Sequence, residues 1–259
     1  MGKGAKELSR YILQTLKVLK FFDMVRYGGQ NCTTCEVGQE KQHEFASRGA
    51  QPIISRGSER RRPVDIHQLE LVLQQQDYRR ITGVDEAGRG ALAGPVVASA
   101  VILPINHRIL GVTDSKQLSP KQRDRLFDEI HDTAIAIGVG CVNSDEIDRI
   151  NILQATMQAM RQAILQICPL PDYALVDGTH LPQIPLPAQA IPKGDSLIQS
   201  ISAASIIAKV TRDRLMIEFD KAYPHYSFQR HKGYGTLQHR QAISQFGSCP
   251  IHRRSFRLQ

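Results

Sequence analysis

Asp85 and Glu86 stand side by side in the stretch Ile81-Thr-Gly-Val-Asp-Glu-Ala-Gly-Arg-Gly90, directly after a short apolar run. The apolar run predicts a β-strand, and the glycines on either side of Arg89 predict a loop whose backbone can approach another molecule closely. Two carboxylates at the end of a strand, next to an electropositive backbone loop, suit a metal ion bound beside a phosphate. A solvated acidic turn would have the same local sequence, so this pair alone does not decide between the two.

Two further aspartates lie at comparable points of the chain. Asp177 ends the apolar run Tyr173-Ala-Leu-Val-Asp177 and precedes Gly178, and Asp195 follows the short run Ala188-Gln-Ala-Ile191. Taken singly, Asp177 also fits a turn, and Asp195 also fits a helix N-cap. If these strands are neighbours in one sheet, however, all four carboxylates converge near one edge of it.

A cluster of four carboxylates repels itself, which raises the pKa of its members. Divalent cations remove that conflict, and an all-oxygen set without His or Cys nearby in sequence indicates Mg²⁺ or Mn²⁺ rather than zinc. Two such ions about 4 Å apart would activate a water and stabilise the leaving oxygen in phosphodiester cleavage. The residue types therefore predict a metal-dependent phosphodiester hydrolysis.

Alternating strand and helix patterns surround these carboxylates and must position them. Ser119 and Pro120 have the residue types preferred at a helix N-cap and at the first helical position. We expect strands in the run that begins at Ile81 and at 95–103, 134–142, 173–178 and 188–191. We expect helices at about 66–73, 120–131, 144–167, 197–222 and 236–246. This order predicts an α/β domain built around one sheet.

Residues 1–78 are expected to form a basic N-terminal extension ahead of this domain. Residues 7–27 have the apolar spacing of an amphipathic helix, whereas residues 28–64 have the composition of a linker. Cys32 and Cys35 form a lone Cys-x-x-Cys pair without the two further ligands that a zinc site needs. Free thiols are therefore the simpler interpretation of this pair.

Composition and charge bound the class of protein. The chain has 259 residues, of which 41% are hydrophobic, and this is enough for a sizeable core. A net charge of +8 predicts a polyanionic partner such as nucleic acid. The five cysteines are scattered, which indicates a reducing compartment rather than a disulfide framework. Because we find neither a secretory signal nor a run of the ~20 apolar residues of a membrane span, we expect a cytoplasmic protein without a membrane span. We also expect it to be a monomer.

Several segments of the chain, in the same order, resemble ribonuclease HII, the type 2 ribonuclease H, over about residues 79–259. They are Gly83-Val-Asp-Glu-Ala-Gly-Arg-Gly90, Leu92-Ala-Gly-Pro-Val-Val97, Asp114-Ser-Lys-Gln-Leu118, Val176-Asp-Gly178, Lys193-Gly-Asp195, Ala203-Ala-Ser-Ile-Ile-Ala-Lys-Val-Thr-Arg-Asp213, His231-Lys-Gly-Tyr-Gly-Thr236 and His252-Arg-Arg-Ser-Phe256. The resemblance implies a ribonuclease H-like α/β fold, with a central mixed sheet flanked by helices and a C-terminal helical part.

The same resemblance implies an activity and its catalytic residues. It implies an endonuclease that degrades the RNA strand of RNA–DNA hybrids and incises 5′ of ribonucleotides embedded in duplex DNA, leaving 3′-hydroxyl and 5′-phosphate ends. The catalytic carboxylates would be Asp85, Glu86, Asp177 and Asp195. The first three would be ligands of the cofactor, a divalent cation, Mn²⁺ or Mg²⁺.

The resemblance also implies how the ribonucleotide is recognised. The backbone of Gly88, Arg89 and Gly90 would grip the RNA–DNA junction through the 2′-hydroxyl and the phosphates. Tyr234 would stack by the deoxyribose that follows. A protein that distinguishes RNA from DNA must sense the 2′-hydroxyl, and glycine allows the backbone to come close enough. Lys116 is a candidate phosphate contact because of its charge.

Other classes of protein fit parts of the sequence. A catalytically weak hybrid- or RNA-binding protein of the same fold would be expected to lack at least one carboxylate, and all four are present. A dinucleotide-binding protein could share the spacing of Gly88 and Gly90, but a helix must follow that pattern, whereas Pro95 leads into a predicted strand. A related nuclease that prefers long hybrids is less compatible with the Gly-Arg-Gly loop and Tyr234.

Overall fold

The computed structural model describes residues 69–105 and 108–258. The helix expected at 7–27, the linker expected at 28–64 and the pair in Cys32-Thr-Thr-Cys35 lie outside the described residues. Across the two described ranges, none of the helices is both long enough and apolar enough to cross a membrane.

A five-stranded mixed sheet forms the centre of the described domain, as expected. Its strands are β1 (Ile81–Ala87), β2 (Val96–Ile102), β3 (Ala136–Val142), β4 (Tyr173–Asp177) and β5 (Ala188–Ile191). They lie in the order β3-β2-β1-β4-β5, in which β2 pairs antiparallel with β1 and β3, and β4 pairs parallel with β1 and β5. Because the loop after β1 leads into an antiparallel strand and not into a helix, the dinucleotide-binding arrangement is excluded.

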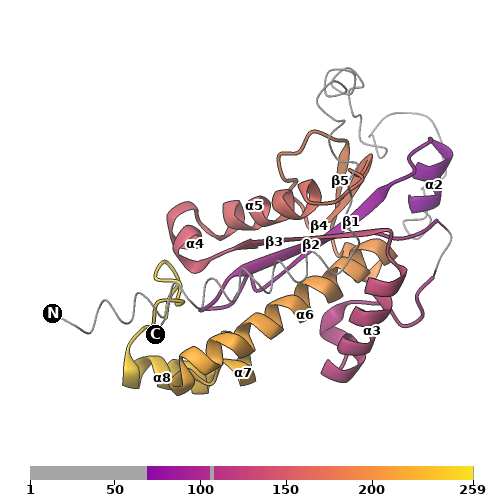
Figure 1. The fold of residues 1–259 in the computed structure, drawn as a ribbon. Coiled ribbons are helices and arrows are strands. Elements are labelled where there is room, and N and C mark those ends of the chain that lie inside the picture. Colours follow the sequence, from indigo (N-terminus) through magenta and orange to yellow (C-terminus); the bar gives the residue numbers. More distant parts are fainter. Residues whose placement is uncertain (1–68, 106–107, 259) are drawn as a thin grey trace. The chain divides into compact units, whose positions relative to one another are not determined.

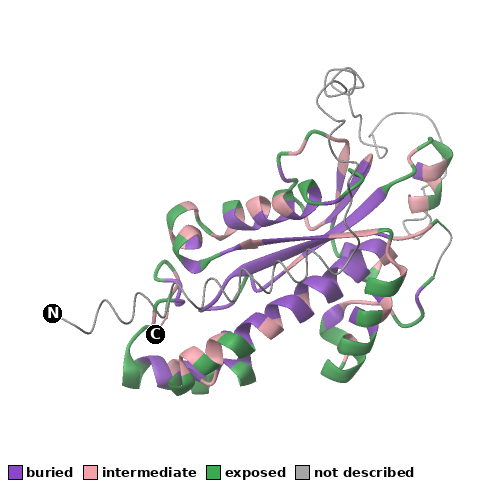
Figure 2. Ribbon diagram, viewed as in Figure 1, coloured by how far each residue is buried: buried purple, intermediate pink, exposed green. Residues whose placement is uncertain are grey.

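Helices cover both faces of this sheet (Figure 1). On one face lie α4 (Ser144–Ile150) and α5 (Ile152–Leu165), and on the other lie α3 (Pro120–Thr133) and the long α6 (Gln199–Ala222). The central strands between them are buried (Figure 2). One apolar cluster joins α5 to Val84, and a second joins α6 to Ile81, so alternate residues of β1 serve opposite faces. The second cluster includes α2 (Leu69–Gln75), which overlaps the helix expected at 66–73.

Local signals set the start of α3. The Ser119 side chain accepts a hydrogen bond from the backbone N–H of Gln122, and the Gln122 side chain accepts one from the backbone N–H of Ser119. This reciprocal capping box, with Pro120 in the first turn, confirms the predicted N-terminus of the helix.

The single helix expected over 144–167 is wrong, because Asn151 divides it into α4 and α5. Asn151 has a φ of 69°, a left-handed conformation that asparagine visits more readily than most residues. Its side chain accepts hydrogen bonds from the backbone N–H groups of Leu153 and Gln154, and so caps α5. The apolar periodicity continues across this break, which is why it predicted one helix.

Helix α6 crosses β1 in direct backbone contact at Gly83. A Cβ atom at this position would lie 2.1 Å from the carbonyl carbon of Ser200 and 2.2 Å from the backbone nitrogen of Ile201. Glycine alone leaves room for this approach, which brings α6 against the strand that ends in Asp85.

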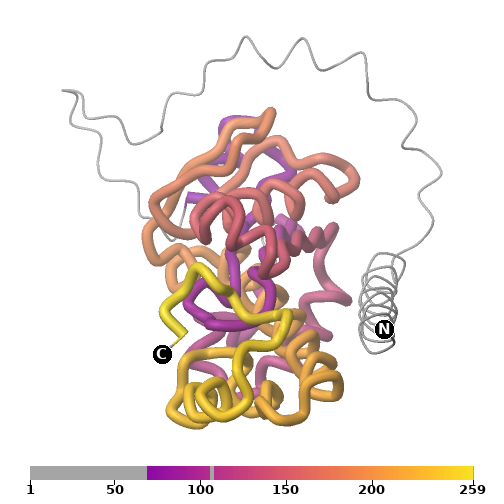
Figure 3. The backbone as a smooth tube through the Cα atoms, turned by 90° about the vertical axis from the view of Figure 1, so that its left-hand side faces the viewer, coloured from indigo at the N-terminus to yellow at the C-terminus, as the bar shows by residue number. Residues whose placement is uncertain are grey.

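A C-terminal helical part packs on the end of α6, as expected. It contains α7 (Phe228–His231) and α8 (Leu237–Phe246). A third apolar cluster joins Leu92, in the loop after β1, to Met216 of α6 and Ile243 of α8. Figure 3 shows the C-terminal segment, in yellow, beside the indigo loop after β1, to which it is joined by an isolated antiparallel bridge.

The close approach at Gly83 gives a stability prediction. Gly83→Ala should lower the free energy of unfolding by about 1–3 kcal/mol, because the new methyl group has only main-chain atoms to displace. The matched control is Gly90→Ala, since a Cβ atom at Gly90 would have no heavy atom within 4 Å. Urea unfolding measures both variants. Equal stability of Gly83→Ala and the wild type would contradict the packing described here.

Candidate active site

Asp85 and Asp177 lie side by side because β1 and β4 are parallel neighbours. The register pairs the residues immediately before them, so the two aspartates occupy the same level of the sheet. Both lie on the face covered by α6, since they alternate in step with Ile81 and Leu175, which pack against that helix. Asp85 is only 4% exposed. Asp85 is therefore buried, next to a partly buried Asp177.

A short 3₁₀ helix, η4 (Gly194–Ser196), brings Asp195 to the same place. The backbone N–H groups of Gly194 and Asp195 donate to Oδ1 of Asp177 at 2.7 and 3.4 Å. The Ser202 hydroxyl on α6 donates to the Asp195 carbonyl at 2.6 Å. Asp195 therefore belongs to a turn fastened to β4 and α6, and it is not the N-cap of α6.

We call Asp85, Glu86, Asp177 and Asp195 the acidic cluster. Burial raises the pKa of Asp85 well above its ordinary value, and the charges of Glu86 and Asp177 raise it further. Burial also raises the pKa of Asp177, and the charge of Asp195 adds to this rise. Burial raises the pKa of Glu86 in spite of the nearby Arg89 guanidinium. The cluster thus carries the mutual repulsion that its sequence positions predicted.

Lys116 lies against the acidic cluster. Its Nζ is 3.4 Å from Oδ2 of Asp195 and 3.9 Å from Oδ1 of Asp114. Partial burial alone would lower the pKa of Lys116, but the carboxylates of Asp114, Asp195 and Asp85 raise it above its ordinary value. The side chain is 76% exposed and can therefore reorient. Lys116 was predicted to contact a phosphate, and the structure places it beside the Asp195 carboxylate. The sequence did not predict this ion pair.

The acidic cluster has the chemistry of a divalent cation site, although its side chains are not closed around one point. Among the described residues, no three His, Cys, Asp or Glu side chains form a group that could already hold a metal ion. One reason is that Asp85 and Glu86 are consecutive in a strand and leave its opposite faces. The donor set nevertheless fits Mg²⁺ or Mn²⁺, because it consists of carboxylates whose pKa values are raised by burial and further by the charges of their neighbours.

The Gly-Arg-Gly loop follows the acidic cluster directly. Gly88 has a φ of 92°, and a Cβ atom there would lie 1.8 Å from Nε of Arg212. Arg89 and Gly90 are exposed, and the Arg89 guanidinium lies 3.6 Å from Oε1 of Glu86. The loop is therefore buried at its first residue, open at the next two, and linked to the carboxylates by an ion pair.

Tyr234 lies next to this loop, although about 145 positions separate them in the sequence. The backbone N–H groups of Leu92 and Ala93 donate to the Gly233 carbonyl at 2.8 and 3.3 Å. The Tyr234 ring has the Arg212 guanidinium 5.4 Å and the Lys209 Nζ 5.6 Å from its centroid. The structure thus brings together the loop and the tyrosine that were expected to contact the ribonucleotide.

Sequence reasoning missed two buried arginines and three buried histidines in this region. Arg212 and Arg253 have no exposed surface. His239 Nδ1 is 3.0 Å from the Tyr234 carbonyl, and burial lowers the pKa of this histidine to about 4. His231 and His252 are buried beside it, with a lowered pKa in each case. A basic residue type usually predicts exposure, so no signal in the sequence distinguished these side chains from solvated ones.

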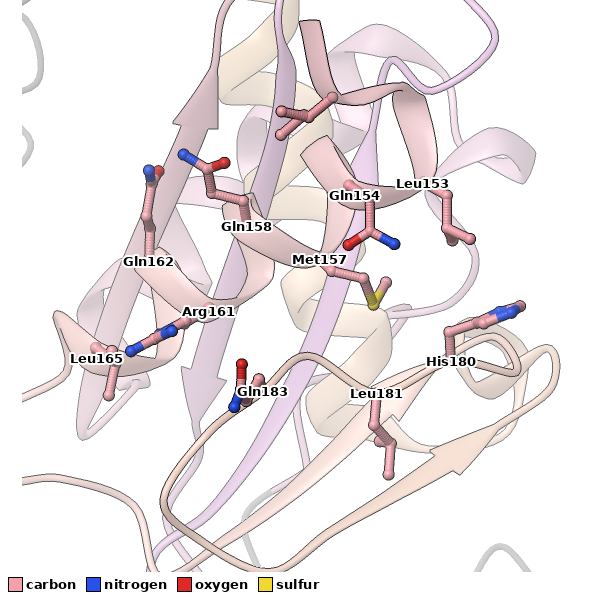
Figure 4. A pocket seen from close by; sticks show the side chains of 11 residues that line it. Leu153, Gln154, Met157, Gln158, Arg161, Gln162, Leu165, His180, Leu181 and Gln183 are labelled. Carbon is pink, nitrogen blue, oxygen red and sulfur yellow. The ribbon is translucent and has the colours of Figure 1, made fainter. Parts of the chain in front are cut away.

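A separate groove of about 760 Å³ lies between α5 and the loop after β4 (Figure 4). Leu153 and Met157 line it from α5, and His180 and Leu181 line it from the loop. None of the predicted site residues lines this groove. It is therefore distinct from the acidic cluster.

The fold and the acidic edge of the sheet define a class of enzyme, the ribonucleases H. The solved structure of ribonuclease H2 from Pyrococcus horikoshii OT3 superposes with a TM-score of 0.59 at 30% identity, covering 69% of this chain and 94% of that one. The family model "Ribonuclease HII" matches residues 82–259. The chain belongs to the ribonuclease HII family, and is thus a ribonuclease H, an endonuclease that acts on RNA–DNA hybrids.

Curated relatives agree with this assignment. Ribonuclease HII of Geobacter sulfurreducens is 59% identical over 180 residues, which cover 70% of this chain and 83% of the relative. Ribonuclease HII of Clostridioides difficile is 43% identical over 255 residues, covering 98% of this chain and 97% of the relative. The second alignment extends into residues 1–78, which the family model does not match.

Repulsion in the acidic cluster gives a second prediction. In EDTA at pH 8, Asp85→Asn should be more stable than the wild type by about 1 kcal/mol, because a raised carboxyl pKa means that ionisation opposes folding. Thermal unfolding measures this difference, and added Mn²⁺ should raise the midpoint of the wild type but hardly that of the variant.

Asp124→Asn is the matched control, because Asp124 is an exposed carboxylate that pairs with Arg214 at 3.4 Å. It should show no gain in stability. If Asp85→Asn is less stable than the wild type without metal, the repulsion is not what we describe.

Proposed function

We propose that the acidic cluster is the catalytic centre and that it incises duplex DNA 5′ of embedded ribonucleotides as well as cleaving RNA in long hybrids. The products would carry 3′-hydroxyl and 5′-phosphate ends. The observation that carries this proposal is the parallel register of β1 and β4, which joins Asp85 and Asp177 on one face. The hydrogen bonds from the backbone N–H groups of Gly194 and Asp195 to the Asp177 carboxylate support it.

Asp85, Glu86 and Asp177 would hold a divalent cation, Mg²⁺ or Mn²⁺. When bound, such a cation activates the attacking water and stabilises the leaving oxygen. Asp195 would complete the set of carboxylates, and its backbone N–H holds the Asp177 carboxylate in one orientation. Lys116 would partly neutralise the cluster in the free enzyme and then turn to a substrate phosphate, a movement that its exposure allows.

Gly88, Arg89 and Gly90 would read the ribonucleotide through their backbone. Support comes from the open space in front of Gly90 and from the ion pair that sets Arg89 beside Glu86. Tyr234 would stack by the deoxyribose on the next nucleotide, at a distance from the loop that main-chain hydrogen bonds hold constant. We call the backbone of Gly88, Arg89 and Gly90, together with the Tyr234 side chain, the reading group. The reading group and the acidic cluster would thus contact neighbouring nucleotides of one strand.

We propose in addition that residues 79–259 form the catalytic domain and residues 1–78 a basic extension. The start of the family match at residue 82 supports this boundary. The proposed partners are RNA–DNA hybrids and ribonucleotide-containing DNA, handled by a monomer in the cytoplasm during ribonucleotide excision repair. The net charge of +8 suits such a polyanionic substrate.

A DNA duplex that carries one ribonucleotide tests the activity. With Mg²⁺ or Mn²⁺, the protein should cut once, on the 5′ side of the ribonucleotide, and Asp85→Asn should lower the rate by at least about 100-fold. Denaturing electrophoresis of end-labelled strands measures the position and the rate of cleavage. Binding without cleavage would instead favour a hybrid-binding protein of this fold. Equal cleavage rates in the wild type and Asp85→Asn would contradict the proposed catalytic centre.

Replacing Tyr234 tests the recognition of the ribonucleotide. Tyr234→Ala should reduce kcat/KM on the one-ribonucleotide duplex by about 10-fold or more, because losing the contact between the ring and the deoxyribose should cost at least about 1.4 kcal/mol of transition-state stabilisation. Overall duplex affinity should change by less than about threefold. Tyr234→Phe is the control, since it keeps the ring. Parallel losses of cleavage and affinity in Tyr234→Ala would argue against a recognition role.

A further inference from the structure

Arg253 is a buried cation whose donors all bind main-chain carbonyls. It has no exposed surface. Its Nε donates to the Gly94 carbonyl at 3.0 Å, its Nη1 to the Arg89 carbonyl at 2.9 Å, and its Nη2 to the Gly88 carbonyl at 2.7 Å. The planar fork of the guanidinium therefore holds two consecutive carbonyls of the Gly-Arg-Gly loop.

Arg212 does the same for the neighbouring segments. It too has no exposed surface. It donates to the carbonyls of Pro95 at 2.9 Å, Lys232 at 2.9 Å and Ala93 at 3.1 Å. The first and third bonds hold the chain that follows the Gly-Arg-Gly loop, and the second holds the turn that carries Tyr234. The two arginines thus connect the Gly-Arg-Gly loop to the turn of Tyr234 on the buried side of the proposed reading group.

Neither arginine forms an ion pair with a carboxylate among the described residues. Burial lowers the pKa of Arg253 to about 9, and the charge of Arg212 adds to this effect. Arg253 therefore remains a cation at neutral pH. A buried charge without a counter-ion is costly, and the main-chain carbonyls that the two guanidinium groups bind offset only part of that cost. Two such cations lie against the buried side of the Gly-Arg-Gly loop and the chain that follows it. We therefore look for a role of their charge and of their planar guanidinium groups.

The geometry of the peptide group supplies that role. A trans peptide is planar, so its N–H points away from its carbonyl. With the Gly88 carbonyl turned inward to Arg253, the N–H of Arg89 is turned outward, and with the Arg89 carbonyl turned inward, the N–H of Gly90 is turned outward. Both residues are exposed, and within the described part of the chain neither N–H donates to another group.

We propose that Arg253, supported by Arg212, is a positioning residue that fixes the N–H groups of Arg89 and Gly90 as a rigid pair of donors. The pair faces the 2′-hydroxyl and the phosphate of the ribonucleotide, so this inference rests on the proposed function. The two buried positive charges strengthen the pair, because a cation behind an outward amide adds to the attraction of an anion. Gly88 has to be glycine here, since the Arg212 side chain fills the space of its Cβ.

Arg253→Lys tests this inference. Lysine keeps the charge and nearly the length, but its single ammonium group cannot replace the fork on both carbonyls. The readout is the ratio of the Kd for an all-DNA duplex to the Kd for the same duplex with one ribonucleotide, measured in the inactive Asp85→Asn background. We expect Arg253→Lys to lower this ratio at least about fivefold while the affinity for all-DNA duplex changes less than about twofold.

The matched control is Arg149→Lys. Arg149 forms a similar two-point fork, to Glu146 at 2.7 and 2.6 Å, but on the exposed surface of α4. This control should leave the ratio unchanged. A merely structural role of Arg253 would reduce both affinities together, and either that result or an unchanged ratio overturns the inference. Failure of the wild type to cleave 5′ of the ribonucleotide would instead overturn the proposed function.

A measurement on the wild type keeps the inference testable if Arg253→Lys does not fold, which circular dichroism will show. The ¹⁵N order parameters of the Arg89 and Gly90 amides should match those of β1, about 0.85, because both carbonyls are held. Values below about 0.6, typical of a mobile loop, would overturn the inference.

Discussion

The carboxylates of Asp85 and Asp177 repel each other at one edge of the sheet, and the surrounding elements must hold them there. The parallel register of β1 and β4 places Asp85 beside Asp177, and the η4 turn adds Asp195, at a place where burial raises the pKa values of the first two. Such an arrangement has a free-energy cost that a bound cation relieves. Close packing of α6 on Gly83 and the hydrogen bonds around η4 hold the cluster together against that cost.

The cations of the site fall into two kinds with different tasks. Lys116 is exposed and pairs with Asp195, so its charge can move when a stronger cation or a phosphate arrives. Arg212 and Arg253 are fully buried and donate their hydrogen bonds to main-chain carbonyls, so their guanidinium groups are held in place. The proposed catalytic carboxylates and the proposed recognition loop thus have different cations beside them. The ion pair between Glu86 at the end of β1 and Arg89 in the following loop connects the two parts.

Much of the fold followed from local pattern. Short apolar runs predicted all five strands, and the Ser119 capping box marked the start of α3. The division of α4 from α5 at Asn151 did not follow, because a single left-handed residue interrupts the backbone without disturbing the apolar periodicity. The buried roles of Arg212 and Arg253 did not follow either, because they bind backbone carbonyls of distant segments, and a carbonyl has no residue type to read.

Residue types and their order along the chain are enough to find four carboxylates at strand ends, a glycine-flanked arginine and the succession of segments that identifies the family. Those features are local, since residue type and spacing along the chain define them. The three-dimensional packing was needed to learn which strands are neighbours, that Lys116 lies on Asp195, and that Arg253 turns the Gly88 and Arg89 carbonyls inward. These are contacts between residues roughly 80 to 165 positions apart, and the packing of the sheet, α6 and the C-terminal segment determines them.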